Sequence, residues 1–459
     1  MIAHRPRAGW IPFGVVVIFV AGLLSGRLLE GKGLAQQAET YEELRPFTEV
    51  LNQVQRNYVE ETTTRDVVYG AIRGLLNVLD PHSSFMPPDV YKEMQVDTKG
   101  EFGGVGIQIG LKDERLTVIA PIEDTPAFRA GVLAGDKIVK IDGTSTKDMT
   151  LMDGVNKMRG AKGTKVTLTL ERSGTPEPID VVLTRETIKV TSTRHKMLED
   201  GIGYVRLTQF QEQSGPDLAK ALNALREQKA QSFILDLRNN PGGLLTAAVE
   251  VSEQFLPKGK AVVSIKGRHG SAEEYPAEGA HPILDAPLIV LVNEGSASAS
   301  EIVAGAMQDW GRAVVVGTTT FGKGSVQTVI PLSDGSALRL TTAKYYTPKG
   351  RSIQNTGITP TIVVRAAGKG EGRRPTVRER DLERHLPNPT GEPQAPAAPS
   401  EPSEPVELPP IPDVPQGGTG ADDDIQLQKA IELLKSWAIF KGLLDQPEPS
   451  VEAGQANPT

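Results

Sequence analysis

Three serines at alternating positions are the residues of this sequence best placed for nucleophilic chemistry: Ser296, Ser298 and Ser300. They follow an apolar run at 287–292 that is typical of a buried strand, and they precede a stretch at 300–310 with the spacing of an amphipathic helix. N–H groups and the dipole at the start of a helix stabilise negative charge, which suits a nucleophile whose reaction forms an oxyanion. A second interpretation is structural: Ser298 followed by Glu301 fits a capping box, and such boxes are more common than nucleophiles.

A serine nucleophile needs a base, and the histidines of this chain stand in no evident partner motif. The sequence contains six of them: His4, His82, His195, His269, His281 and His385. His4 precedes an N-terminal apolar run and His385 lies in a linker region, whereas the other four lie in loop-like or helix-ending contexts without a paired acid. No G-x-S-x-G elbow is present either, so a Ser-His-Asp arrangement is poorly supported.

Lys323 offers a base of a different kind. It lies between two glycines in FGKGSVQ at 321–327, at the start of a predicted strand. A lysine can accept a proton near pH 7 when desolvation lowers its pKa enough to leave it neutral. Side chains alternate along a strand, so Lys323, Ser325 and Gln327 are expected on one face, where Gln327 would orient the amine. The alternatives are a solvated surface lysine and a polar glutamine on an edge strand.

A glycine-rich turn precedes an alternating strand in EFGGVGIQI at 101–109. Such a turn can hold an anion on its N–H groups, and the strand edge can accept an extended peptide. With TPAFRAGVLAGDKIVKIDG at 125–143, it resembles a PDZ domain of the bacterial, circularly permuted kind, although the glycines alone would suit an ordinary turn. The resemblance implies that Gly104, Val105 and Gly106 receive a terminal carboxylate, with Ile107 and Ile109 beside the peptide. Arg159, which ends a predicted PDZ helix, is a hypothetical link to the rest of the protein; its alternative role is a solvated helix-end cation.

Composition excludes several classes of function. At 459 residues the chain is too long for one core of typical size, and it predicts two or three domains. The net charge of -7 gives no support for nucleic-acid binding, which usually leaves a basic footprint. The absence of cysteine excludes disulfides, thiol catalysis and thiolate metal sites. The sequence shows no metal-ligand constellation and no phosphate-binding loop, so it implies no cofactor.

An apolar run at 10–24 predicts export of the chain. The run follows Arg5 and Arg7 and ends before Arg27. Its length lies at the boundary between the core of a signal peptide and a short membrane helix. We therefore expect membrane association through the N-terminal segment and an extracytoplasmic location, in the periplasm or cell envelope.

Changes in periodicity divide the chain into regions. Helical spacing gives way near residue 99 to alternating strands with glycine punctuation, and from residue 201 strands alternate with helices, as in an α/β core. A proline-rich region cannot bury enough apolar surface to fold. The apolar faces of the terminal helices would suit a homodimer. The predicted regions are a signal peptide or anchor (1–35), N-terminal helices (36–98), a PDZ domain (99–188), an α/β core (189–365), a disordered linker (366–423) and an amphipathic helix (424–446).

Several motifs together resemble one family, the carboxyl-terminal processing peptidases (tail-specific proteases), which are serine peptidases with a Ser-Lys catalytic pair. NEGSASASEI at 293–302 and FGKGSVQ match its central motifs. Three further stretches match in order: LDPHSSFM at 79–86, LDLRNNPGG at 235–243 and TTAKYYTPKGRSIQNTGITP at 341–360. The resemblance implies an α/β core of the crotonase or Clp-protease kind with an inserted PDZ domain. It also implies that Ser298 is the nucleophile, Lys323 the general base and Gln327 its support.

The chemistry implied by the resemblance is acyl transfer. Neutral Lys323 would take the proton of Ser298, whose oxygen attacks a scissile carbonyl and gives an acyl-enzyme that water hydrolyses. Ala299 N–H is expected to be one oxyanion donor, and Gly242 or Gly243 the other. The substrates would be the C-termini of proteins or peptides. Two other functions are a crotonase-like acyl-coenzyme A enzyme and a non-catalytic PDZ adaptor.

Overall fold

The computed structural model describes residues 42–112, 114–268, 270, 272–279, 283, 285–365, 377–390 and 424–444. The chain forms two compact units, which end and begin at Val78 and Leu79. The predicted signal peptide or anchor (1–35) lies outside the described residues, as does most of the predicted linker. Within the described ranges, no helix has both the length and the apolar character to cross a membrane.

The first unit is helical, as the spacing of its apolar residues predicts. Its described part is a helix at 42–57 followed by α2 (Thr64–Asn77). Thr63 caps α2, because its hydroxyl accepts a hydrogen bond from Asp66 N–H at 3.1 Å. Large apolar side chains of the first helix, such as Phe47, are exposed. The described helices of this unit therefore leave much apolar surface uncovered.

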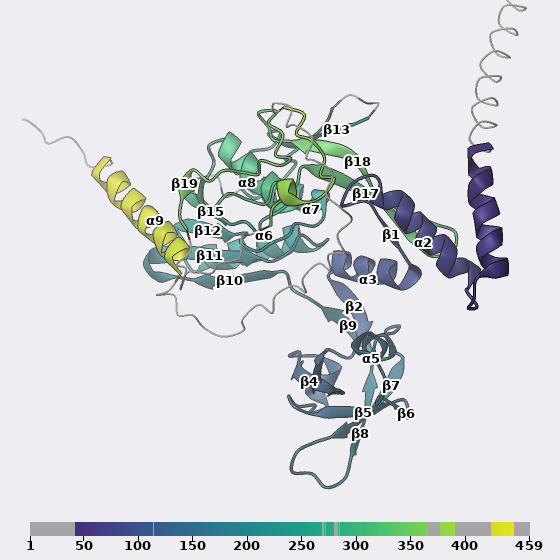
Figure 1. Ribbon diagram of the computed structural model, residues 1–459. Helices are drawn as coiled ribbons and strands as arrows, with labels where there is room; N and C mark the ends of the chain where they lie inside the picture. The colour runs from purple at the N-terminus through teal and green to yellow at the C-terminus, as the bar shows by residue number, and fades with distance from the viewer. Residues whose placement is uncertain are drawn as a thin grey trace, which may run out of the picture. The chain divides into compact units, whose positions relative to one another are not determined.

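The second unit contains a β-rich domain close to the predicted PDZ boundaries. The chain enters it through β2 (Glu101–Gly104) and leaves it through β9 (Glu186–Lys189), and these two strands pair with each other (Figure 1). Between them, a sheet has the order β3-β4-β5-β7-β8, with β6 on β5. Its elements are β3 (Ile107–Lys112), β4 (Arg115–Pro121), α4 (Pro126–Arg129), β5 (Lys137–Ile141), β6 (Thr144–Ser145), α5 (Leu151–Met158), β7 (Lys165–Glu171) and β8 (Ile179–Thr184). Alternate residues of β7 are buried, as a period of two predicts.

The α/β core is built on a six-stranded sheet with the order β10-β11-β12-β15-β16-β19. Only the β10–β11 pair of this sheet is antiparallel. The strands are β10 (Thr193–Met197), β11 (Ile202–Leu207), β12 (Ser232–Asp236), β15 (Leu288–Val292), β16 (Val314–Gly317) and β19 (Ile362–Val363). Every residue of β12 and β15 is buried, as their continuous apolar runs predict for a sheet that is covered on both faces.

Helices cover both faces of this sheet. The helices of the core that precede β16 in the chain are η1 (Glu199–Gly201), α6 (Ser214–Glu227), α7 (Leu245–Glu253) and α8 (Ala299–Asp309). Side chains of α6, α7 and α8 form one apolar cluster with Leu235 and Val290, whereas α9 (Ile425–Leu444) forms another with Ile289. Asp424 caps α9 by accepting Leu427 N–H at 3.1 Å. The predicted C-terminal helix thus packs on the core.

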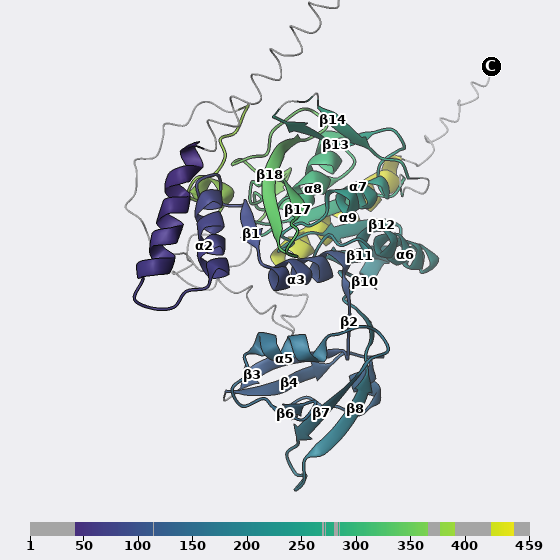
Figure 2. The ribbon, with the colours of Figure 1, turned by 90° about the vertical axis from the view of Figure 1, so that its right-hand side faces the viewer.

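A second sheet brings together distant parts of the chain. Its order is β1-β18-β13-β14, with β17 paired to β18 (Figure 2). Its strands are β1 (Ser84–Met86), β13 (Ala261–Gly267), β14 (Glu273–Pro276), β17 (Ser325–Pro331) and β18 (Ala337–Tyr346), and α3 (Pro88–Lys99) follows β1. Phe85 pairs with Leu338 across β1 and β18. The strand of the LDPHSSFM motif, β1, therefore lies in the same sheet as β17, the strand that follows the Lys323 loop.

One part of the predicted linker is folded, so the linker prediction is wrong for residues 377–390. These residues contain a short 3-10 helix, η2 (Glu379–Asp381), and the Glu379 side chain is fully buried. Composition suggested a solvated charge run because it averages over residues with different surroundings. Here, buried polar partners in the core satisfy the glutamate, which removes the usual cost of burying it.

Candidate active site

Ser298 stands at the N-terminus of α8, in the turn that follows β15. It is the N-cap residue, and the Glu301 carboxylate accepts its N–H at 2.8 Å, as a capping box predicts. Its backbone has φ 53° and ψ -113°, which non-glycine residues rarely adopt. Backbone strain of this kind is concentrated at functional sites, because the surrounding structure must enforce it. The cap and the nucleophile interpretations are therefore compatible.

The two neighbouring serines are fully buried and hold the turn in place. Ser296 Oγ donates to the Leu237 carbonyl at 2.8 Å, and Ser300 Oγ donates to the Asn240 carbonyl at 2.9 Å. Ser298 is partly exposed instead. Among the three, its hydroxyl is the one that a substrate can reach.

The NNPGG loop lies directly against Ser298. Gly242 has φ 101°, and a Cβ built on it would lie 2.9 Å from Ser298 Cβ and 2.9 Å from Ala299 N, so only glycine fits there. Gly242 N–H already donates to Asn240 Oδ1 at 2.9 Å. Within the described part of the chain, neither Gly243 N–H nor Ala299 N–H donates a hydrogen bond. Of the two glycines, Gly243 is therefore the better candidate for the second oxyanion donor.

Lys323 is held in a buried loop before β17. Burial lowers its pKa to about 8, with a smaller contribution from Arg339, whereas Glu379, Glu301 and Asp80 act in the opposite direction. About a tenth of the amine is then neutral at pH 7. Among the described residues, no hydrogen bond joins this amine to Ser298 Oγ. Hydrogen bonds between catalytic groups often tighten only when substrate binds.

The expected hydrogen bond between Gln327 and the Lys323 amine is not found among the described residues. Its amide donates to Ser325 Oγ at 2.9 Å and to Thr341 Oγ1 at 3.3 Å. The pairing of β17 with β18 shifts its register between Val326 and Gln327. The contact between Gln327 and Ser325 agrees with the shared face that a period of two predicts for these two residues, in spite of this bulge.

Glu301 connects the two catalytic candidates, which the sequence did not reveal. Its fully buried carboxylate accepts Ser298 N–H at 2.8 Å, Lys323 N–H at 2.9 Å and Gly322 N–H at 2.7 Å. Thr320 Oγ1 donates to it at 2.5 Å. Burial raises its pKa to about 7, although these four donors favour the charged form. The capping-box pattern identified only the contact with Ser298, because the others come from a distant loop.

Tyr345 is a second residue that the sequence did not single out. Its buried hydroxyl donates to the Lys323 carbonyl and shares a hydrogen bond with the Ser298 side chain. Burial raises the pKa of this phenol well above its usual value, so it stays protonated and able to donate. Tyr345 lies in the 341–360 motif, and that match was the only signal that pointed to it.

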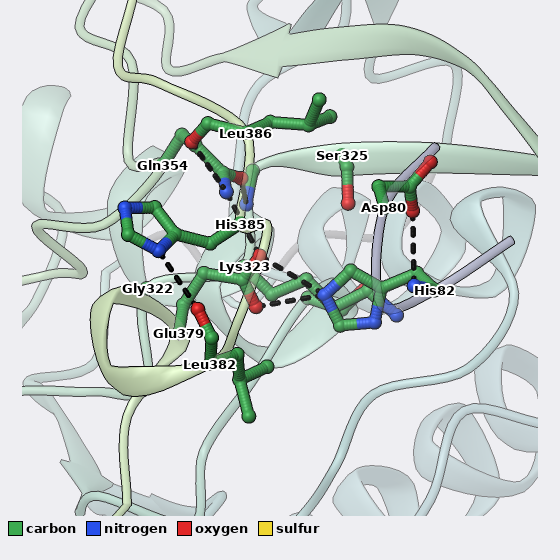
Figure 3. Close-up of polar contacts among 12 residues, drawn as sticks. Asp80, His82, Gly322, Lys323, Ser325, Gln354, Glu379, Leu382, His385 and Leu386 are labelled. Carbon is green, nitrogen blue, oxygen red and sulfur yellow. Dashed lines mark hydrogen bonds and ion pairs between the residues drawn. The ribbon is translucent and has the colours of Figure 1, made fainter. Parts of the chain in front are cut away.

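His82 has a paired acid, which corrects the expectation that it lacks one. Its ring Nε2 lies 2.8 Å from a carboxylate oxygen of Glu379 (Figure 3). Asp80 fixes the turn by accepting the N–H groups of His82 and Ser83 at 2.9 and 3.0 Å. The pair was missed because its two residues lie near opposite ends of the described chain.

The PDZ residues named from the sequence line a single cavity. They are Gly104, Val105, Gly106, Ile107 and Ile109. Apolar side chains of α5 and the ring of Phe102 complete the lining. The Arg159 guanidinium lies 4.7 Å from the centre of that ring and also lines the cavity, so Arg159 is more than a solvated helix-end cation. This arrangement can accept an extended peptide with an apolar end.

Comparison with known proteins agrees with this geometry. The model of peptidase family S41 matches residues 201–364, and a PDZ domain model matches residues 103–183. A carboxy-terminal-processing protease of Bartonella bacilliformis is 45% identical over 81% of this chain and 88% of its own length. A carboxyl-terminal-processing protease of a Picosynechococcus species is 38% identical over 79% of this chain and 91% of its own length.

A solved structure of a photosystem II D1 C-terminal processing protease has 32% sequence identity, covers 70% of this chain and 92% of its own, and has a TM-score of 0.40. The sequence relatives and the two domain matches carry the assignment, since they span both the PDZ domain and the core. The chain therefore belongs to the carboxyl-terminal processing proteases of peptidase family S41, and it is a serine-type peptidase.

Proposed function

We propose that this peptidase cleaves proteins near their C-termini with Ser298 as nucleophile and Lys323 as general base. One observation supports these roles above others: a single buried carboxylate, Glu301, accepts the N–H groups of both residues. The strained turn presents one hydroxyl, and a desolvated lysine loop is bonded to the same carboxylate. Nothing in the described residues favours acyl-coenzyme A chemistry or a non-catalytic adaptor over this role.

The reaction begins when neutral Lys323 takes the proton from Ser298 Oγ, which then attacks the scissile carbonyl. The N–H groups of Ala299 and Gly243 stabilise the oxyanion, because they belong to the turn and the loop that flank the nucleophile and neither has an acceptor among the described residues. The lysine then protonates the leaving amine, which leaves an acyl-enzyme. Water hydrolyses the acyl-enzyme with Lys323 again as base. Gln327 supports this loop through Ser325 rather than through the amine.

Substrate selection begins in the PDZ cavity. We assign the terminal carboxylate to the N–H groups of Gly104, Val105 and Gly106, and the preceding residues of the substrate to the edge formed by Ile107 and Ile109. Apolar side chains of the substrate would fill the cavity. The apolar run of the chain at 10–24 supports an extracytoplasmic location with N-terminal membrane association. A homodimer would cover the exposed apolar residues of the first helices.

The test is degradation of an unfolded protein with an apolar C-terminus by the wild type, Ser298→Ala and Lys323→Ala. We expect both variants to lose at least about 1,000-fold in kcat/KM. A substrate with an amidated C-terminus serves as the control for PDZ capture and should raise KM. Full activity of Lys323→Ala would exclude the Ser-Lys mechanism. Binding without cleavage by the wild type would favour an adaptor.

A further inference from the structure

The loop that carries Lys323 is bounded on its upstream side by the folded segment 377–390. Arg378 Nη2 donates to the Thr320 carbonyl at 2.6 Å, and Glu379 N–H donates to the Phe321 carbonyl at 3.2 Å. These two carbonyls belong to the residues just before Gly322. The segment therefore binds the backbone that leads into the catalytic lysine.

The downstream side of the same loop is bound through one glutamine. Gly324 N–H donates to Gln354 Oε1 at 2.8 Å, and Gln354 Nε2 donates to Glu379 Oε1 at 2.8 Å. Both Gln354 and Glu379 are fully buried. Glu379 thus reaches the backbone on both sides of Lys323, once by its own N–H group and once through the Gln354 amide.

A histidine from the N-terminal side completes the arrangement. His82 Nε2 lies 2.9 and 2.8 Å from the two carboxylate oxygens of Glu379 (Figure 3). The backbone of His82 is fixed in turn by Asp80, whose carboxylate also accepts Thr341 Oγ1 at 3.0 Å. The carboxylate of Glu379 therefore has partners from two elements, and neither partner belongs to its own segment.

We propose that Glu379, which His82 contacts, is a positioning residue for the catalytic base, and that it fixes the Lys323 loop through its own N–H group and through Gln354. This inference rests on the role proposed for Lys323. It makes segment 377–390 a working part of the peptidase, although it lies beyond the residues that the S41 family model matches. The charge of Glu379 also favours the protonated form of the lysine amine, together with Glu301 and Asp80 and against Arg339.

The decisive variant is Glu379→Gln in the full chain. It keeps the size of the side chain but removes the charge and one acceptor oxygen, so the loop loses a fixed partner. We expect kcat to fall at least about tenfold while KM changes less than about twofold, because substrate capture lies elsewhere. Removal of the negative charge lowers the pKa of Lys323, so the acidic limb of the pH–rate profile moves to lower pH. A purely structural role would not move that limb.

His82→Asn measures the other end of the same contact. We expect a smaller fall in kcat, and the double variant with Glu379→Gln should lose no more than Glu379→Gln alone, because both changes remove one shared interaction. Glu227→Gln, an exposed carboxylate on α6, is the matched control and should behave as wild type. If Glu379→Gln does not fold, His82→Asn is judged by the same kcat and pH measurements.

The outcomes separate this inference from the proposed function. Inactive Lys323→Ala together with wild-type kcat and pH profile in Glu379→Gln would overturn the role of Glu379 alone. Activity in Lys323→Ala would overturn the proposed base and the inference with it. Strictly additive losses in the double variant would show that His82 and Glu379 act separately, contrary to the proposal.

Discussion

The turn of Ser298 and the loop of Lys323 are joined through Glu301 and Tyr345, yet different kinds of structure hold them in place. The Ser298 turn follows β15 and rests on the loop that follows β12, the neighbouring parallel strand. The Lys323 loop rests on Gln354 and on the segment that carries Glu379, and His82 contacts Glu379 from the N-terminal side of the chain. The nucleophile is thus positioned by sheet topology. The base follows β16, the next parallel strand, but its loop also depends on side-chain contacts from distant segments.

This difference indicates which substitutions the Ser298 turn and the Lys323 loop each tolerate. In an open α/β sheet, functional residues gather at the carboxyl ends of neighbouring parallel strands, so the fold itself brings the NNPGG loop to the Ser298 turn. No such rule brings His82, Gln354 and Glu379 together. The base therefore depends on side-chain contacts that single substitutions can remove, whereas the nucleophile depends on close backbone packing.

The largest effect that tests this comparison is expected from Gly242→Ala. A Cβ there would lie 2.8 Å from the Ala297 carbonyl and 2.9 Å from Ser298 Cβ, at a backbone φ of 101°. The loop must move away from the nucleophile, and we expect kcat to fall about 100- to 1,000-fold through the disturbed oxyanion site. Gly70→Ala is the control, because nothing lies within 4 Å of its Cβ. Near-normal kcat in Gly242→Ala would contradict the view that backbone packing positions the nucleophile.

The next effect concerns the residue that joins the two halves. In Glu301→Gln, one carboxylate oxygen becomes an NH2 group that faces N–H donors, so we expect about 1–3 kcal/mol of destabilisation and at least about a tenfold loss of kcat. Urea unfolding and steady-state kinetics measure the two effects. Wild-type stability and kcat in Glu301→Gln would show that the shared carboxylate does not connect Ser298 and Lys323.

The same variant has a signature in the pH dependence of stability. The pKa of Glu301 is about 7 in the folded protein, against an ordinary value of 4.5, so the folded state binds more protons within that window. Its contribution is fully present below about pH 4.5 and is lost as pH rises through about 7. The stability difference between wild type and Glu301→Gln should therefore be larger at about pH 5 than at about pH 8. The opposite ordering would mean that the four donors, rather than burial, dominate this carboxyl.

The sequence predicted the nucleophile half more fully than the base half, for physical reasons. Alternating and continuous apolar patterns determine strands and helices, and these place Ser298 and Gly242 by topology. The period of two predicted that Gln327 and Ser325 share a face, but it did not predict that the Gln327 amide would bond to Ser325 Oγ and Thr341 Oγ1. His82 and Glu379 are close only in the folded chain, and composition alone treated the segment around Glu379 as solvated linker.

A moderate effect is expected in the pH dependence of activity, which reports on the base. Lys323 must be neutral to accept a proton, and burial places its pKa at about 8. We expect kcat/KM to rise about tenfold between about pH 7 and about pH 9, after correction for any loss of folded protein. Glu227→Gln should show the same rise, since it leaves the lysine loop unchanged. A flat profile across this range would remove the support for a titrating lysine base.

The smallest effect is expected on the nucleophile side, from Ser300→Ala. The variant loses one hydrogen bond to the Asn240 carbonyl, but that carbonyl still accepts Ala297 N–H at 3.0 Å and is not left without a partner. We expect a loss of about 1 kcal/mol in stability and less than about a threefold change in kcat.

Ser296→Ala is the matched comparison for Ser300→Ala. The Ser296 hydroxyl both donates to the Leu237 carbonyl and accepts Asn293 N–H at 3.0 Å. Its removal leaves Asn293 N–H without this acceptor, although the Leu237 carbonyl still accepts Asn240 N–H at 3.3 Å, so Ser296→Ala should destabilise more than Ser300→Ala. Thermal unfolding measures the stability of both variants, and steady-state kinetics measures their kcat. If Ser300→Ala reduced kcat as strongly as Glu379→Gln, the turn would depend on single side-chain contacts as much as the lysine loop does. The contrast between topology and long-range contacts would then no longer hold.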